Sequence, residues 1–177
     1  IRYQNDIDRA TAALQSAIDS LNKNAADYTS VDDAIALVIE RENLIKDTYA
    51  DSYGFTAETF YSNWSSVTAA VNAVVRGLDF SEQSRVDAFA TAIVNALNSL
   101  TENTADYTEV RAVYDEAYEI VTSGANLYTE SSLDRLTSAY TSVVFSRPIS
   151  QQAEVDAYVA SINEAIENLE YLPADYS

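Results

Sequence analysis

The stretch QSRVDAFATAIVNALNSL, residues 83–100, decides the fold because the chain contains it in three versions. The other two are QNDIDRATAALQSAIDSL at residues 4–21 and QAEVDAYVASINEAIENL at residues 152–169. Four residue types recur at matched positions, namely Gln4/Gln83/Gln152, Asp8/Asp87/Asp156, Ala17/Ala96/Ala165 and Leu21/Leu100/Leu169. Apolar residues recur between them at the three- and four-residue spacing of one helix face. The sequence therefore predicts an all-α repeat protein.

A second motif marks the boundaries of the repeats. Each copy is followed at the same distance by Ala-Asp-Tyr-Thr or Ala-Asp-Tyr-Ser, starting at Ala26, Ala105 and Ala174. The predicted divisions are the last helix of a preceding repeat (1–25), repeat 1 (26–104), repeat 2 (105–172) and the start of a further repeat (173–177). Three helices per repeat predict tandem three-helix bundles, about seven helices in all, arranged end to end. The first helix is then left without a bundle of its own. We expect it to pack elsewhere on the same chain, on the adjacent bundle, and the alternative is that it packs on a bundle of another chain.

Capping residues and glycines indicate where the helices of repeat 1 begin and end. Thr29 and Thr56 are predicted to cap its first two helices, and Gly77 to stop the second. The first helix is expected to end near Lys46, which leaves residues 47–55 as a tyrosine-rich loop. The second helix is expected to bury Phe60, Trp64, Val67, Val71 and Val74. The corresponding boundary signals of repeat 2 are Thr108, Gly124, Thr129 and Pro148.

The composition limits the partners that the chain can have. Acidic residues number 28 and basic residues 10, which gives a net charge of −18. So negative a surface repels phosphate backbones and anionic lipid headgroups, and it disfavours binding to nucleic acid or to a membrane surface. No apolar run reaches the ~20 residues of a membrane span, so direct membrane insertion is not expected.

The residue types present also exclude several kinds of chemistry. The chain has no histidine and no cysteine, which excludes Ser/His and Cys/His nucleophile systems and thiolate metal sites. Paired acids occur at Asp32/Asp33, Glu40/Glu42 and Asp115/Glu116, but neighbours on a helix point to different faces. We interpret them as a solvated surface, and the recurring Asp8, Asp87 and Asp156 as structural. No enzyme activity and no cofactor are therefore predicted.

Two weaker site signals also favour a structural interpretation. Calcium needs only oxygen ligands, yet the chain has no D-x-[DN]-x-[DN]-G loop, and the pair Asp47/Asp51 is insufficient for a site. No metal site is predicted. Asn63 lies in an N-glycosylation sequon, but the adjacent Trp64 is expected to face the core.

The thirteen tyrosines are the unusual feature of the composition. Tyr28, Tyr107 and Tyr176 recur beside aspartate at repeat boundaries, where a ring can cover a helix end and its hydroxyl can find a partner. Aromatic residues also gather in the segment that lengthens repeat 1, and exposed aromatics can anchor a protein or a sugar. The candidate binding surface is therefore Tyr49, Tyr53, Phe55 and Tyr61. The alternative is that this segment folds onto its own bundle.

The repeats resemble the FIVAR module ("found in various architectures"). The resemblance rests on Tyr128-Thr129-Glu130-Ser131-Ser132-Leu133, followed after a long helix by the copy at residues 152–169. Repeat 1 offers Phe55-Thr56-Ala57-Glu58-Thr59-Phe60, with phenylalanine in place of the tyrosine. The resemblance covers nearly the whole chain. It implies a small helical bundle repeated in tandem within secreted or wall-anchored bacterial proteins, without catalytic residues.

The sequence therefore favours a non-catalytic spacer or stalk repeat of an extracellular or cell-surface protein. Its partners would be the flanking domains of the same polypeptide. Two alternatives are an adhesive module that binds a surface protein or a glycan, and a subunit of a self-assembling extracellular filament.

Overall fold

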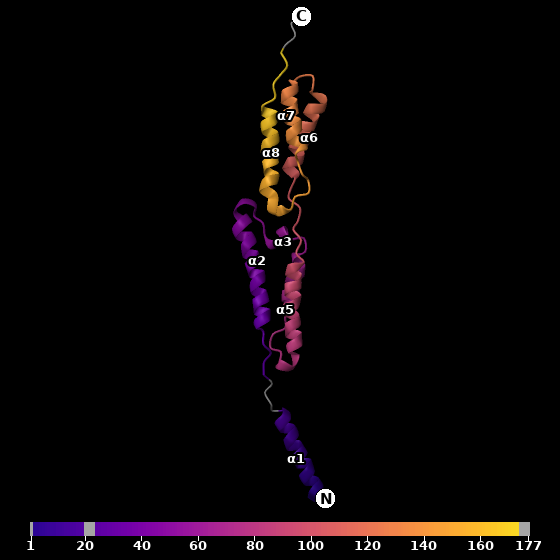
Figure 1. Ribbon diagram of the computed structural model, residues 1–177. Coiled ribbons are helices and arrows are strands. Elements are labelled where there is room, and N and C mark those ends of the chain that lie inside the picture. Colours follow the sequence, from indigo (N-terminus) through magenta and orange to yellow (C-terminus); the bar gives the residue numbers. More distant parts are fainter. Residues whose placement is uncertain (1, 20–23, 174–177) are drawn as a thin grey trace. The chain divides into compact units, whose positions relative to one another are not determined.

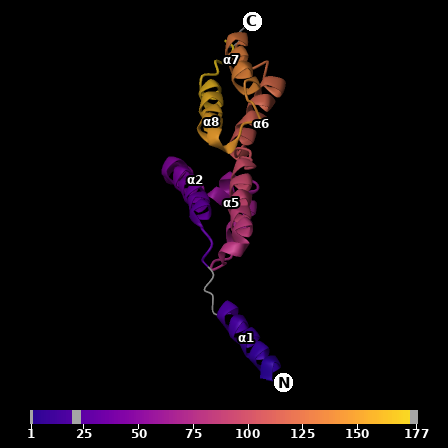
Figure 2. The ribbon, with the colours of Figure 1, turned by 60° about the horizontal axis from the view of Figure 1, so that its bottom comes forward.

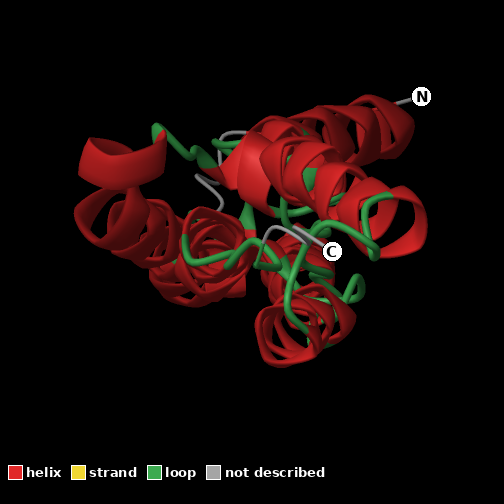
Figure 3. Ribbon diagram, turned by 90° about the horizontal axis from the view of Figure 1, so that it is seen from above, coloured by secondary structure: helices red, strands yellow, loops and turns green. Residues whose placement is uncertain are grey.

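All regular secondary-structure elements in the described part of the chain are helices. The computed structural model describes residues 2–19 and 24–173, and Figures 1 and 3 show helices joined by loops, with no strand among these residues. The elements are α1 (Arg2–Asp19), α2 (Thr29–Tyr53), α3 (Ala57–Phe60), α4 (Trp64–Asn72), η1 (Phe80–Glu82), α5 (Gln83–Asn98), α6 (Thr108–Ser123), α7 (Glu130–Thr141), η2 (Ile149–Gln151) and α8 (Gln152–Glu167). The predicted all-α class is confirmed.

The chain forms two compact units. The first comprises Ile1–Asn43 and Ser65–Ser99, and the second comprises Leu44–Trp64 and Leu100–Ser177. The segment Leu44–Trp64, which the repeat pattern places in repeat 1, thus packs with residues of repeat 2. The repeat boundaries describe the period of the sequence, whereas the units describe its packing.

Three helices that pack on one another pairwise form the main body of the second unit. Figures 1 and 2 show α6, α7 and α8 side by side. One apolar cluster joins Val110 of α6 to Val155 of α8, and a second joins Ala117, Leu136 and Ile162, one from each helix. The apolar face of residues 152–169 therefore packs against partner helices, as its helical spacing predicts.

The first unit contains α1, the first part of α2, nearly all of α4, and α5. Val31 and Ala34 of α2 are buried, as is Val67 of α4. Val86 and Ile93 of α5 are buried at the repeat positions that Val155 and Ile162 occupy in α8. The two later copies of the recurring helix therefore bury the same face.

The first copy buries nothing among its described side chains. Every side chain from residue 3 to residue 18 of α1 is exposed, including Ile7 at 58%, Leu14 at 64% and Ile18 at 51%. The expectation that this helix packs elsewhere on the same chain is therefore wrong.

The predicted loop at residues 47–55 is also wrong, because α2 continues as a helix to Tyr53. The segment contains no glycine or proline before Gly54, so nothing interrupts the helix earlier. Ile45 is buried and Tyr49, one turn later, is half-buried, so the extension has an apolar face of its own. Gly54 then ends the helix with a φ of 67°, a conformation that glycine adopts without strain.

The second helix of repeat 1 is divided in two, contrary to the single helix expected from Thr56. Thr56 does cap a helix, through a capping box with Thr59, but α3 ends after four residues. Tyr61 is extended and forms a β-bridge with Glu102, which breaks the helical path before α4 begins at Trp64. Phe60, Trp64 and Val67 are buried as predicted, whereas Val71 and Val74 are only half-buried.

Three other predicted helix ends also differ in detail. The helix α4 ends at Asn72, before Gly77, and α7 ends at Thr141, before Pro148. Short 3-10 turns, η1 and η2, then lead into α5 and α8 in the same manner. Asp27, and not Thr29, supplies the side-chain oxygen at the start of α2, because its Oδ1 accepts hydrogen bonds from the Thr29 amide and hydroxyl.

Candidate functional site

A buried glutamine joins the start of α6 to the start of α8. The Gln152 side chain accepts a hydrogen bond from the Asp106 amide (2.7 Å) and donates one to the Asp106 carbonyl (3.0 Å). It also donates to Oδ1 of Asp156, one helical turn further along α8 (2.8 Å). The side chain is 6% exposed, so these partners replace water almost completely. One amide thus fixes the register of two helices.

The first unit contains the same arrangement. Gln83 accepts from the Asp27 amide (2.7 Å), donates to the Asp27 carbonyl (2.9 Å) and donates to Oδ1 of Asp87 (2.8 Å). In α1 only the local part is present among the described residues, where Gln4 donates to Oδ1 of Asp8 (2.9 Å). We call the hydrogen bonds of Gln83 and of Gln152 the glutamine junctions.

A tyrosine completes each junction. The Tyr107 hydroxyl donates to the Val144 carbonyl (2.7 Å) and accepts from the Arg147 amide (3.0 Å). Tyr28 does the same with the Val75 carbonyl (2.8 Å) and the Leu78 amide (3.2 Å). The structural role expected for these two tyrosines is confirmed, while Tyr176 lies outside the described residues.

The aspartates of the two described Ala-Asp-Tyr motifs, Asp27 and Asp106, are held in their charged form. The hydroxyl and the amide of Thr108 both donate to Oδ1 of Asp106, at 2.6 and 2.8 Å. These bonds, the hydroxyl bond first, hold the pKa of the Asp106 carboxyl below its usual value. Asp27 and Thr29 repeat this arrangement, with the same direction of pKa shift for Asp27. Asp8, Asp87 and Asp156 likewise accept hydrogen bonds, which agrees with the structural role expected for them.

The four aromatic residues of the candidate binding surface belong to one cluster in the second unit. The Tyr49 and Phe60 ring centroids lie 5.1 Å apart, and Tyr53 stacks on Phe55 at 5.1 Å with an interplanar angle of 15°. Tyr61 packs edge-on against Phe60 at 5.0 Å. Tyr61 is only 7% exposed, whereas Tyr49, Tyr53 and Phe55 are half-buried. The inner part of the cluster is therefore buried, but the segment packs in the second unit, with residues of repeat 2, and not on its own bundle as the alternative expected.

The outer part of the cluster lines a pocket of about 310 Å³. The pocket is lined by Tyr53, Phe55, Asp106, Glu109, Val110, Gln152, Asp156 and Val159. It thus combines two stacked rings with three carboxylates, a set that can accept hydrogen bonds from hydroxyl or ammonium donors beside an apolar face. Sequence reasoning found the rings but missed the junction residues Asp106 and Gln152 beside them. Their recurrence in each repeat was the available signal.

No family model, no curated protein and no solved structure matches this chain. The resemblance to the FIVAR module therefore stays a prediction, and the assignment of a function rests on the residues of the chain itself.

Tyr53 and Asp156 form a hydrogen bond between two residues that line this pocket. The Tyr53 hydroxyl donates to Oδ2 of Asp156 at 3.0 Å, while Gln152 occupies the other oxygen of that carboxylate. Burial raises the pKa of Tyr53, and the hydrogen bond to Asp156 and the charge of Asp156 raise it further. Both oxygens of Asp156 are occupied, so this carboxylate acts as an acceptor that positions the ring.

Replacing Asp156 by asparagine should lower the pKa of Tyr53, because the negative charge that opposes ionisation is removed. In the native chain the raised pKa stabilises the fold below the unfolded value of ~10, and this contribution is lost as the pH rises through the folded value. The Tyr53 ring signal, followed by nuclear magnetic resonance against pH, measures the change. The matched control is Asp87→Asn at the same repeat position of α5. An equal shift of the Tyr53 pKa in both variants would contradict the assigned contact.

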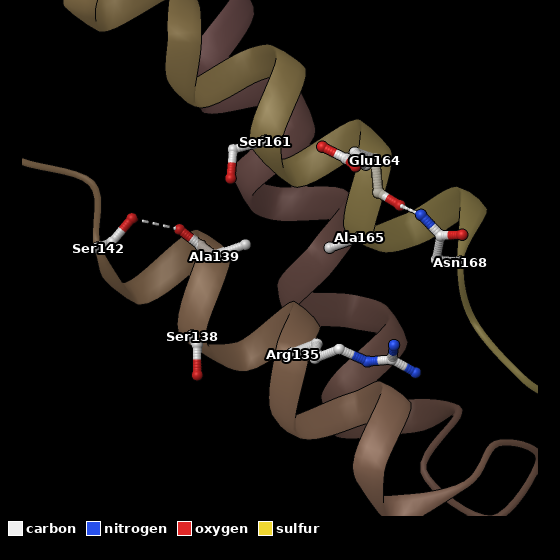
Figure 4. A pocket seen from close by; sticks show the side chains of 8 residues that line it. All are labelled: Arg135, Ser138, Ala139, Ser142, Ser161, Glu164, Ala165 and Asn168. Atoms are coloured by element: carbon white, nitrogen blue, oxygen red, sulfur yellow. Dashed lines mark hydrogen bonds between the residues drawn. The ribbon is translucent and has the colours of Figure 1, made fainter.

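A second pocket, of about 460 Å³, lies along α7 and α8 but carries no evident chemistry. Figure 4 shows its lining, which is Arg135, Ser138, Ala139, Ser142, Ser161, Glu164, Ala165 and Asn168. Several of its polar groups bond to their own helices. Ser142 donates to the Ala139 carbonyl, and Asn168 donates to the Glu164 carbonyl, as the dashed lines indicate. We interpret this pocket as a groove left by small residues.

The remaining site signals can be placed as well. Oδ1 of Asn63 accepts a hydrogen bond from the Thr101 amide (2.9 Å), and the adjacent Trp64 is 3% exposed, as expected. Within residues 2–19 and 24–173, no group of three or more acidic side chains is arranged to hold a metal ion. None of the helices in those ranges has both the length and the hydropathy of a membrane span.

Proposed function

We propose that the chain is a non-catalytic structural spacer of a secreted or cell-surface bacterial protein, built from tandem three-helix bundles joined end to end. The flanking domains of the same polypeptide are its partners. This proposal keeps the FIVAR resemblance as a working hypothesis. The two alternatives, an adhesive or binding module and a filament subunit, stay predictions.

The observation that carries the proposal is the connection between the repeats, residues 101–107. On one side, the Asn103 amide donates to the Phe60 carbonyl (2.9 Å), and the Asn103 side chain donates to the Thr59 carbonyl (2.8 Å). On the other side, the Asn103 carbonyl accepts from the Ile149 amide (2.8 Å), and the Ala105 amide donates to the Arg147 carbonyl (3.0 Å). All these residues belong to the second unit.

Such a connection differs from a flexible linker in a measurable way. Flexible linkers are rich in glycine and serine and leave their backbone groups to water, whereas residues 101–107 contain neither residue and bond to both repeats. A spacer must keep its ends apart, and these hydrogen bonds hold residues 101–107 to residues of both sequence repeats within the second unit. The bonding of residues 101–107 therefore supports a spacer more than a mobile tether.

Small-angle scattering tests the proposal. A single globule of this length has a radius of gyration of ~16 Å, and we expect a clearly larger value for the chain in solution. Inserting Gly-Gly-Ser-Gly between Thr104 and Ala105 is the control, because it frees the connection without changing any helix. This insertion should broaden the distribution of end-to-end distances. A native radius near ~16 Å would refute the spacer.

A further inference from the structure

We infer that α1 is the third helix of a further bundle, and that the helix pair which covers it precedes it on the same polypeptide and resembles α6 and α7. The inference deepens the proposed function, on which it rests, because it names the partner that the exposed helix takes.

The first step compares the three copies of the recurring helix. At the matched positions Leu14, Ile93 and Ile162, the exposed fractions are 64%, 0% and 0%. At Ile7, Val86 and Val155 they are 58%, 1% and 0%. The same apolar face is thus buried in α5 and α8 and exposed in α1. The two later helices therefore show what kind of surface covers such a face.

The second step identifies that surface from α8. The apolar residues of α8 pack on α6 and α7, where Ile162 shares a cluster with Ala117 and Leu136, and Val155 shares one with Tyr107 and Val110. The partner of α1 is therefore a pair of helices with small or apolar residues at these positions, and its first helix opens with Ala-Asp-Tyr-Thr or Ala-Asp-Tyr-Ser.

The third step uses the glutamine junction. Gln83 and Gln152 each bond to the backbone of the aspartate in an Ala-Asp-Tyr motif and to an aspartate of their own helix. Gln4 makes the second of these bonds, to Asp8, at nearly the same length. The Gln4–Asp8 part of a junction is thus already formed within α1. To complete the arrangement that the two later copies make, Gln4 needs the backbone of an aspartate at a repeat boundary.

The fourth step assigns the source of the partner. The helix before α5 ends at Asn72 and the helix before α8 ends at Thr141, so the same ten residues of connection precede Gln83 and Gln152. In both cases the last helix of the covering pair precedes the covered helix directly in sequence. A pair on the N-terminal side of α1 reproduces this order, whereas the α6–α7 pair of a second copy is already covered by its own α8.

The test restores the missing pair. Residues 101–151 are duplicated and joined directly ahead of Gln4, so that the copied α6 and α7 precede α1 as they precede α8. Hydrogen exchange of the amides of residues 7–18 should slow by at least ~100-fold relative to the unextended chain. In the extended chain these amides would exchange only when the packed bundle unfolds. The matched control carries Ile7→Asp and Leu14→Asp in the same extended chain and should show fast exchange.

Each result of this experiment decides the inference. Exchange of the α8 amides reports whether the rest of the chain is folded. Fast exchange in α1 of the extended chain, with α8 protected, would overturn the inference. In the unextended chain, protection of the α1 amides that increases with protein concentration would show that a second copy of the chain covers the helix. This result would also overturn the inference. The radius of gyration of the native chain tests the spacer separately, so the two failures can be distinguished.

Discussion

Replacing Ile162 by alanine should lower the free energy of unfolding of the second unit by about 2–4 kcal/mol. Ile162 is fully buried in the cluster that α6, α7 and α8 share, so its removal forfeits burial and leaves a cavity. Urea denaturation followed by the fluorescence of Trp64 measures the change, because this single tryptophan is buried in the same unit.

The chain contains its own control for this experiment. Leu14 occupies the same repeat position in α1 but is 64% exposed, so Leu14→Ala should change the free energy of unfolding by less than about 0.5 kcal/mol. Ile93→Ala should lower the free energy of unfolding of the first unit by a similar amount, since Ile93 is also fully buried. Equal effects at Leu14 and Ile162 would contradict the assignment of the covered and bare faces.

The second large effect is expected from Gln152→Leu, which should destabilise the second unit by about 2 kcal/mol. The leucine side chain fills most of the space of the glutamine, but it leaves the Asp106 amide and carbonyl without their hydrogen-bond partners. A buried amide or carbonyl that loses its hydrogen-bond partner lowers the free energy of unfolding by more than the hydrogen bond itself contributed. The same denaturation experiment reports the loss.

Gln4→Leu is the matched change at the exposed copy. Gln4 bonds to Asp8 of its own helix, and its neighbours are solvated, so we expect a change below about 0.5 kcal/mol. A small effect of Gln152→Leu would mean that water can replace the amide at the junction. The junction would then be a consequence of the helix packing and not one of its causes.

The helical faces were predictable from the sequence because a period of 3.6 residues is a local property. Val86, Ile93, Val155 and Ile162 are buried where the three copies of the recurring helix predicted it. Leu97 is only half-buried, because it lies at the edge of the same stripe. The helix ends at Tyr53 and Phe60 were harder to predict, since tertiary contacts decide them.

Two features of the structure could not be predicted from the local sequence pattern. Tyr61 leaves the helical conformation because Glu102, distant in sequence, forms a β-bridge with it. Residues 47–53 form a helix that packs in the second unit, although their polar and aromatic composition is typical of a loop. The candidate binding residues were thus identified as a group, but their partners Asp106, Gln152 and Asp156 come from repeat 2 and could not be inferred from the inserted segment.

The glutamine junctions have a consequence for the behaviour of the chain in salt. Dissolved ions screen interactions between exposed charges, and the ion pairs Arg76–Asp32, Arg135–Glu170 and Arg85–Glu82 all have exposed partners. The bonds of Gln83, Gln152, Tyr28 and Tyr107 to the backbone join neutral groups, which ionic strength barely affects. Brine and dilute buffer should therefore leave the helix register unchanged, while the mutual repulsion of a chain with a net charge of −18 weakens as salt is added.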